Sequence, residues 1–188
     1  MDLEQIKREH AKPIAALDKL ILNFHTVHNI RFWYDCLANF PPTDNIHEDI
    51  LKMDAYVTSI VIGYGRLFGA GTGSRQLNLA QVPEHLLKIH ELFLSLRHER
   101  YAHHGKHATM HASIHLVAKD TSILVQPQIS YWTVLGAPKE WAPLFEWLDA
   151  LMYEQLHQAV DKLSTRTGVR WEVESGPAPR WVGKDEPE

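Results

Sequence analysis

Three long stretches of the chain repeat apolar residues three and four positions apart, which is the spacing of a helix that buries one face. These stretches are residues 15–40, 45–69 and 82–104. The Pro-Pro pair at 41–42 ends the first, a Gly- and Ser-rich loop at 69–74 ends the second, and Pro83 lies in the first turn of the third. Asp44 or Asn45 is the candidate N-cap of the second helix. The pattern therefore predicts three substantial helices in the first half of the chain.

The pattern changes after residue 111. Three short runs are rich in β-branched residues, and they are separated by a turn-like KDT and by Pro127. The runs are ASIHLVA, SILVQPQ and ISYWTVL. They predict two or three strands of a small hairpin. Residues 138–168 then return to helical spacing and stop at Gly168.

Together these elements predict a mainly α protein, a four-helix bundle with a small β-hairpin insertion at about 112–135, before the last helix. We expect residues 1–174 to form a single helical domain. Residues 175–188 are rich in proline, glycine and charge, and we expect a flexible tail there.

Composition narrows the class of protein. The 188 residues are 45% apolar, with a net charge of −4 and a pI near 6.3. This balance counts against a protein that coats nucleic acid non-specifically, but it permits an enzyme that acts on nucleic acid through a few local cations. Cys36 is the single cysteine, and no stretch approaches the ~20 apolar residues of a membrane span. We expect a cytoplasmic protein without a membrane partner.

The third predicted helix carries two polar side chains inside its apolar arc. At about 100° per residue, Arg97 and His90 both fall among the leucines, seven positions apart and nearly in line. A buried guanidinium without a partner costs several kcal/mol. Arg97 is therefore expected either to form an internal ion pair that fixes helix packing, or to line a wet pocket that accepts an anion.

The end of this helix concentrates residues that bind phosphate, transfer protons or hold metals. Residues 96–111 read LRHERYAHHGKHATMH and contain two arginines and five of the thirteen histidines. On an ideal helix His104 returns to the face of Arg97, whereas His103 falls about 120° away. The helical wheel alone does not choose between these two histidines.

The segment LRHERYAH resembles the signature of the HEPN-domain superfamily, an arginine followed by a polar residue and, a few positions later, a histidine. The matching residues are Arg97, His98, Arg100, Ala102 and His103, with five residues between the motif's arginine and histidine. The resemblance also covers the architecture, a bundle of about four helices with the motif late in the third.

The resemblance implies a metal-independent endoribonuclease without a cofactor, in which two subunits form one composite site. Arg97 would hold the scissile phosphate and His103 would transfer protons, with His90, His98, Arg100 and His104 in support. It implies RNA as substrate, a homodimer, and a toxin–antitoxin or defence setting.

Other interpretations stay open, and the sequence leaves undecided whether the protein is an enzyme. One is a non-catalytic protein–protein interaction module, similar to an antitoxin, with a partner protein and a structural Arg97. Another is a histidine-rich metal-binding protein, because imidazole suits Zn, Ni or Cu. Its ligands would be His104, His107 and His111, with His115 nearby. Arg66 lies on the polar side of its helix and is interpreted as a surface cation.

Overall fold

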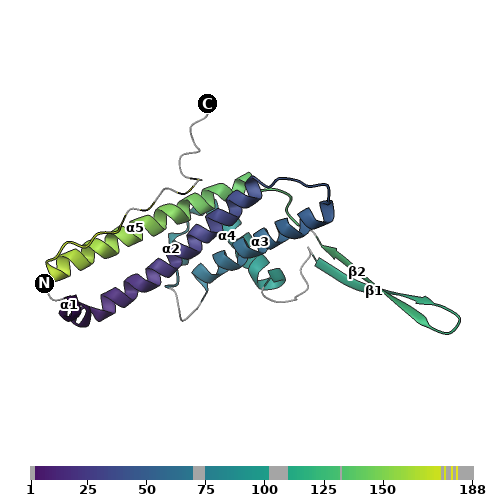
Figure 1. Cartoon of the computed structure of the whole chain (residues 1–188), viewed down its shortest axis with the longest axis horizontal. Coiled ribbons are helices and arrows are strands. Elements are labelled where there is room, and N and C mark those ends of the chain that lie inside the picture. The colour runs from purple at the N-terminus through teal and green to yellow at the C-terminus, as the bar shows by residue number, and fades with distance from the viewer. Residues whose placement is uncertain are drawn as a thin grey trace, which may run out of the picture.

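The chain is mainly helical, and a two-stranded hairpin precedes its long last helix, as the sequence predicts (Figure 1). The computed structural model describes residues 3–69, 75–101, 110–131, 133–174, 176, 179 and 181. The elements are α1 (Leu3–Glu9), α2 (Ala11–Ala38), α3 (Ile46–Phe68), η1 (Leu79–Gln81), η2 (Glu84–Leu86), α4 (Leu87–Ser95), η3 (Leu96–Tyr101), β1 (Met110–Ala118), β2 (Ile123–Tyr131), η4 (Lys139–Trp141) and α5 (Ala142–Thr167). The long helices α2 and α5 lie side by side, and the hairpin projects away from the helices.

The proposed tail at 175–188 lies almost wholly outside the described residues. No helix in the part of the chain that the structure describes is long and apolar enough to cross a membrane.

Local chemistry explains where two of the predicted helices begin and end. The side chain of Asn45 accepts a hydrogen bond from the backbone N–H of Glu48 at 3.3 Å, which caps the start of α3. Gly168 follows α5 with a φ of 66°, a left-handed conformation in which a Cβ would be strained. Its N–H closes the helix on the carbonyl of Ser164.

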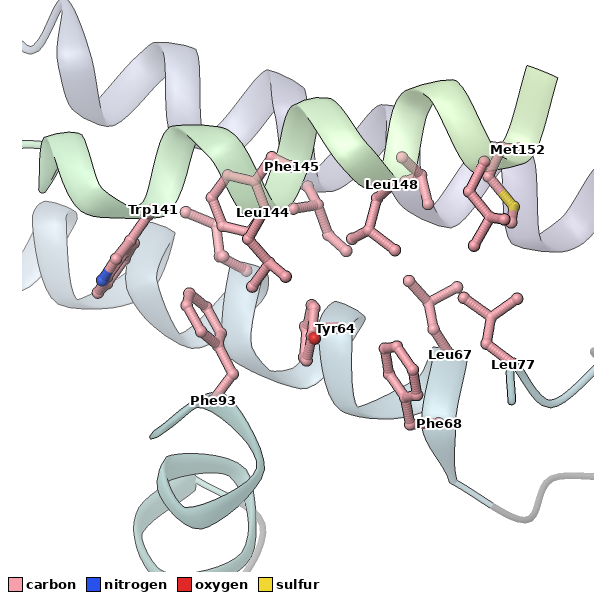
Figure 2. Close-up of a cluster of buried hydrophobic side chains, with 14 of the residues drawn as sticks. Tyr64, Leu67, Phe68, Leu77, Phe93, Trp141, Leu144, Phe145, Leu148 and Met152 are labelled. Carbon is pink, nitrogen blue, oxygen red and sulfur yellow. The ribbon is translucent and has the colours of Figure 1, made fainter. Parts of the chain in front are cut away.

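Phe93 of α4 is fully buried and points from α4 into the hydrophobic core (Figure 2). Its ring centroid is 5.0 Å from that of Tyr64 on α3, 5.6 Å from that of Phe145 on α5, and 4.8 Å from that of Trp141. The three contacts are tilted or edge-on, the arrangements that aromatic pairs favour. Phe93 therefore joins α4 to both α3 and α5, and it fixes the position of the turn that follows α4.

The third predicted helix, 82–104, is not one regular helix. A 3₁₀ turn, η2, leads into α4, which continues into the π-helical turn η3, and residues 102–109 lie outside the described range. Leu87 and Leu92, placed on the apolar arc by the wheel, are 38% and 42% exposed. Among the described residues of this predicted helix, the buried positions are Val82, Leu86, His90, Phe93, Leu96 and Arg100. Ile89 and Leu94 are partly buried against the core, so the buried stripe is narrower than predicted by Leu87 and Leu92.

The hairpin corrects the prediction that Pro127 separates two strands. β2 runs through Pro127, which pairs with Ile114 of β1. Each strand of a two-stranded sheet has one unpaired edge, and a residue without an N–H is tolerated at such an edge. The third predicted run therefore starts inside β2.

The register makes the hairpin amphipathic, because residues that face each other across an antiparallel pair share one side of the sheet. One side, which we call the apolar hairpin face, consists of Ala112, Ile114, Leu116, Ala118, Ile123, Val125, Pro127 and Ile129. All eight are exposed. The opposite side is mostly polar, with His111, Ser113, His115, Gln126, Gln128 and Ser130, and it also carries Val117 and Leu124 towards the turn. Within the described residues, the apolar hairpin face is left open to solvent.

Candidate functional site

The motif segment begins in a π-helical turn, Leu96–Tyr101, that continues directly from α4. Its i to i+5 hydrogen bonds widen the helix, and such turns are rare and frequently occur at functional sites. Within this turn Arg97 is half-buried, His98 and Glu99 are exposed, and Arg100 is buried. Two arginines three positions apart therefore occupy different environments.

Arg100 forms the internal ion pair that the sequence analysis considered for Arg97. Its Nη2 donates to Oδ1 of Asp54 on α3 at 2.8 Å, and the arginine side chain is only 5% exposed. The same carboxylate oxygen accepts from the Tyr101 hydroxyl at 3.3 Å and from the Thr133 hydroxyl at 3.1 Å. One carboxylate thus joins α3, the π turn and the segment after the hairpin.

Burial raises the pKa of the Tyr101 hydroxyl, and the charge of Asp54 raises it further, so this phenol stays neutral and remains a donor. The guanidinium of Arg100 also lies over the Tyr101 ring, 4.7 Å from its centroid. Arg100 is therefore held on two sides, which suits a structural role.

Arg97 packs on a glycine of α3. A Cβ added to Gly65 would lie 2.6 Å from Cγ and 2.8 Å from Cδ of Arg97, so any larger residue at position 65 would displace the arginine stem. Glycine inside a helix costs about 1 kcal/mol relative to alanine, and here it provides the space in which Arg97 crosses α3. Arg97 makes no hydrogen bond or ion pair with the residues that the structure describes. Its charge is held in place without an acidic partner among them.

His90 lies in the core, as the wheel predicts, and it pairs with Tyr64. The Tyr64 hydroxyl and His90 Nδ1 are 2.6 Å apart, and both side chains are buried. Burial lowers the pKa of His90, which Glu91 offsets only in part, and burial raises the pKa of Tyr64. Which of the two groups donates depends on the ring nitrogen of His90 that carries the proton. This pairing gives His90 a packing role between α3 and α4.

The structure does not place the motif histidine. His103, His104 and His107 lie outside the described residues, whereas His111 and His115 lie on the polar side of β1. The ring of His115 contacts the side-chain oxygen of Gln126 at 3.1 Å. Across the described ranges, no three His, Cys, Asp or Glu side chains gather in a metal-binding arrangement.

Sequence reasoning did not predict a groove between α2 and α3, with a volume of about 430 Å³. His25 and Arg66 both line it, together with Trp33, and Asn29 contacts the His25 ring at 3.1 Å. Arg66 is exposed, as expected of a surface cation. The spacing of His25 and Asn29, one helical turn apart, places both on one face of their helix. The sequence did not show that α3 packs beside this face and completes the groove.

Comparison with known proteins found no matching protein family, no similar curated protein and no similar solved structure. The functional interpretation therefore depends on the residues and their geometry.

Proposed function

We propose that the protein binds RNA through Arg97 and cleaves it without a metal, with His103 in proton transfer, as the resemblance to the HEPN superfamily suggests. The observation that supports this proposal most is that the two arginines have different partners. Arg100 satisfies the buried carboxylate of Asp54, while Arg97 is positioned by Gly65 and has no acidic partner among the described residues. An arginine that is always charged and whose aliphatic stem packs against α3 suits bidentate contact with a phosphate.

The proposed reaction needs three groups around one phosphorus atom. The 2′-hydroxyl of the substrate attacks the adjacent phosphorus, a base removes its proton, and the bond to the 5′-oxygen breaks as that oxygen takes up a proton. The products are a 2′,3′-cyclic phosphate and a free 5′-hydroxyl. A histidine titrates in the range that both transfers require, and Arg97 would neutralise the charge that develops on the phosphorane.

We further propose a homodimer in which two motif segments share one site. The apolar hairpin face supports this assembly, because exposed apolar patches of this kind mark interaction surfaces. Thr133, just after β2, bonds to the same Asp54 oxygen as Arg100. The base of the hairpin and the motif turn therefore lie together, so a second copy that approaches the motif can also cover the apolar hairpin face.

A non-catalytic interaction module is the second candidate, and the same apolar hairpin face favours it. Those eight side chains need a cover whether or not RNA is cut. In this case Arg97 contributes to a contact between proteins, and no cleavage is expected on any RNA.

We expect the protein to be a dimer at micromolar concentration and the Ile129→Lys variant to be a monomer, because the new charge lies on the apolar hairpin face. Gln128→Lys is the matched control, since it adds the same charge one residue away on the polar side, and it should remain dimeric. Light scattering coupled to size-exclusion chromatography measures all three masses. A monomeric wild type, or equal behaviour of the two variants, would contradict this assembly.

Arg97→Ala should lower the free energy of unfolding by less than about 1 kcal/mol, because no buried partner charge is left behind. The same change should weaken binding of a single-stranded RNA about tenfold or more, the loss expected for charge-assisted hydrogen bonds to phosphate. Urea denaturation and fluorescence anisotropy measure the two quantities. Lys88→Ala removes an equal charge from the exposed side of α4 and should change neither by much. A loss of about 3–5 kcal/mol for Arg97→Ala would show instead that this arginine is a member of a structural pair.

A further inference from the structure

A second, cationic pocket lies between the first half of α2 and the second half of α5, with a volume of about 300 Å³. These two helix segments lie at the end of the molecule away from the hairpin (Figure 1). Its polar lining consists of Arg75, Lys162, Arg166, Gln81, Gln155 and Gln158. We propose that this pocket binds a small organic anion that combines a phosphate or carboxylate group with an apolar part.

The charged residues that line the pocket are all positive. Three cations line it, and no aspartate or glutamate does among the residues that the structure describes. Arg75, Lys162 and Arg166 form no ion pair with any of those described residues. Like charges that converge without an acid repel one another, and a bound anion would remove this repulsion while it gained charge-assisted hydrogen bonds.

Buried contacts hold the pocket in shape. Asn23 of α2 is fully buried, and its side-chain amide donates to the backbone carbonyl of Arg75. The N–H of Leu77 bonds to the carbonyl of Leu67 at 2.8 Å. The segment that carries Arg75 is thus fastened to both α2 and α3. The backbone that carries one of the three cations is therefore held by buried contacts.

One polar group at the pocket lacks a partner. The side-chain Oε1 of Gln155 is buried and has no hydrogen bond with the described residues. A buried amide without a partner costs free energy, and a glutamine can present either its oxygen or its NH₂ to a ligand. Gln155 is therefore suited to complete a ligand contact that the two helices leave open.

The floor of the pocket is apolar, which defines the rest of the ligand. Leu20 and Leu163 are buried and Leu17 is half-buried beside them. The volume lies at the lower end of the range of small-molecule sites. A free inorganic ion would leave this floor uncovered, whereas a small anion with a ring or a short chain would cover it.

Phenyl phosphate, benzoate, inorganic phosphate and neutral benzyl alcohol are the probes for this pocket. Each is titrated into ¹⁵N-labelled protein while the side-chain amide signals of Gln81, Gln155 and Gln158 are followed. We expect phenyl phosphate or benzoate to shift these signals, and the tighter of the two identifies the anionic group. Inorganic phosphate should bind about tenfold more weakly, because it buries no apolar surface on the floor. Benzyl alcohol should give no saturable shift.

The double variant Lys162→Ala with Arg166→Ala should lower the affinity for the tighter-binding probe at least tenfold. Lys88→Ala should leave this affinity unchanged. Both replaced side chains are exposed on α5, so the variant is expected to fold. An equal effect of Lys88→Ala, or shifts that avoid the three glutamines, would overturn the pocket.

The cationic pocket and the proposed RNA site are separate, and each can be tested without the other. Arg97→Ala should leave the glutamine shifts intact, and the double variant should still bind RNA about as well as Lys88→Ala does. Loss of the shifts in Arg97→Ala, with no loss in the double variant, would place the anion at the motif turn and overturn the pocket.

Discussion

Replacing His103 with alanine is expected to slow RNA cleavage by about 10²–10⁴-fold, the usual effect of losing a general acid or base. The proposed reaction depends on proton transfer at both the attacking and the leaving oxygen, and an alanine provides neither. Cleavage of a single-stranded RNA should continue in EDTA, because none of the assigned steps uses a metal. The products should end in 2′,3′-cyclic phosphate, and a DNA oligonucleotide of the same sequence should stay intact because it lacks the 2′-hydroxyl.

His104→Ala is the matched control, since it removes the neighbouring imidazole, and it should reduce the rate much less. The reverse order would show that the helical wheel, and not the resemblance, identifies the functional histidine. Cleavage that EDTA abolishes and Zn restores would favour a metal site at His104, His107 and His111. No cleavage of any RNA, together with tight binding to a partner protein, would favour the interaction module.

Asp54→Ala is expected to lower the free energy of unfolding by about 3–5 kcal/mol, the usual cost of removing one member of a buried ion pair. The Arg100 side chain that loses this partner is only 5% exposed, and the hydroxyls of Tyr101 and Thr133 lose their acceptor at the same time. Since Asp54 itself is 28% exposed, water can partly replace it, so we expect the lower part of that range. Urea denaturation followed by circular dichroism measures the change.

Glu48→Ala provides the control for this loss, because it breaks an ion pair on the same helix that is exposed. Glu48 and Lys52 are 2.7 Å apart, and their side chains are about half exposed. Surface pairs of this kind contribute less than about 1 kcal/mol. If Asp54→Ala were no more destabilising than Glu48→Ala, Arg100 would have no structural role.

The start of α3 and the end of α5 were predictable because each depends on near neighbours along the chain. Asn45 caps a helix three residues away, and Gly168 ends one through its own backbone conformation. The short runs rich in β-branched residues after position 111 likewise indicated a hairpin before the last helix. Pro127 was wrongly expected to separate two strands, because its tolerance within a strand depends on a sheet with free edges, which is a property of the assembled fold.

The partners of the two arginines could not be predicted, because they lie far away in the sequence. Arg100 is buried by Asp54, which precedes it by 46 positions, and Arg97 is accommodated by the missing side chain of Gly65. A helical wheel of residues 82–104 contains neither Asp54 nor Gly65. The wheel also assumes a constant angle per residue, and the π-helical turn that starts at Leu96 changes this angle. The cationic pocket combines residues of three separate segments and was likewise hidden from local reasoning.

The projecting hairpin and the helical core should differ in the free energy that local opening of their backbone requires. A two-stranded hairpin is marginally stable by itself, and the residues of β1 and β2 are almost all exposed, so its backbone can open while the helical core stays folded. Amide hydrogens in β1 and β2 should then exchange with solvent much faster than those around Phe93, which need global unfolding to exchange. Because the Thr133 hydroxyl is bonded to Asp54, this local opening should begin at the tip and stop at the base. Any molecule that covers the apolar hairpin face would slow exchange along the whole hairpin, so exchange rates report whether the face is occupied even when the occupant has not been identified.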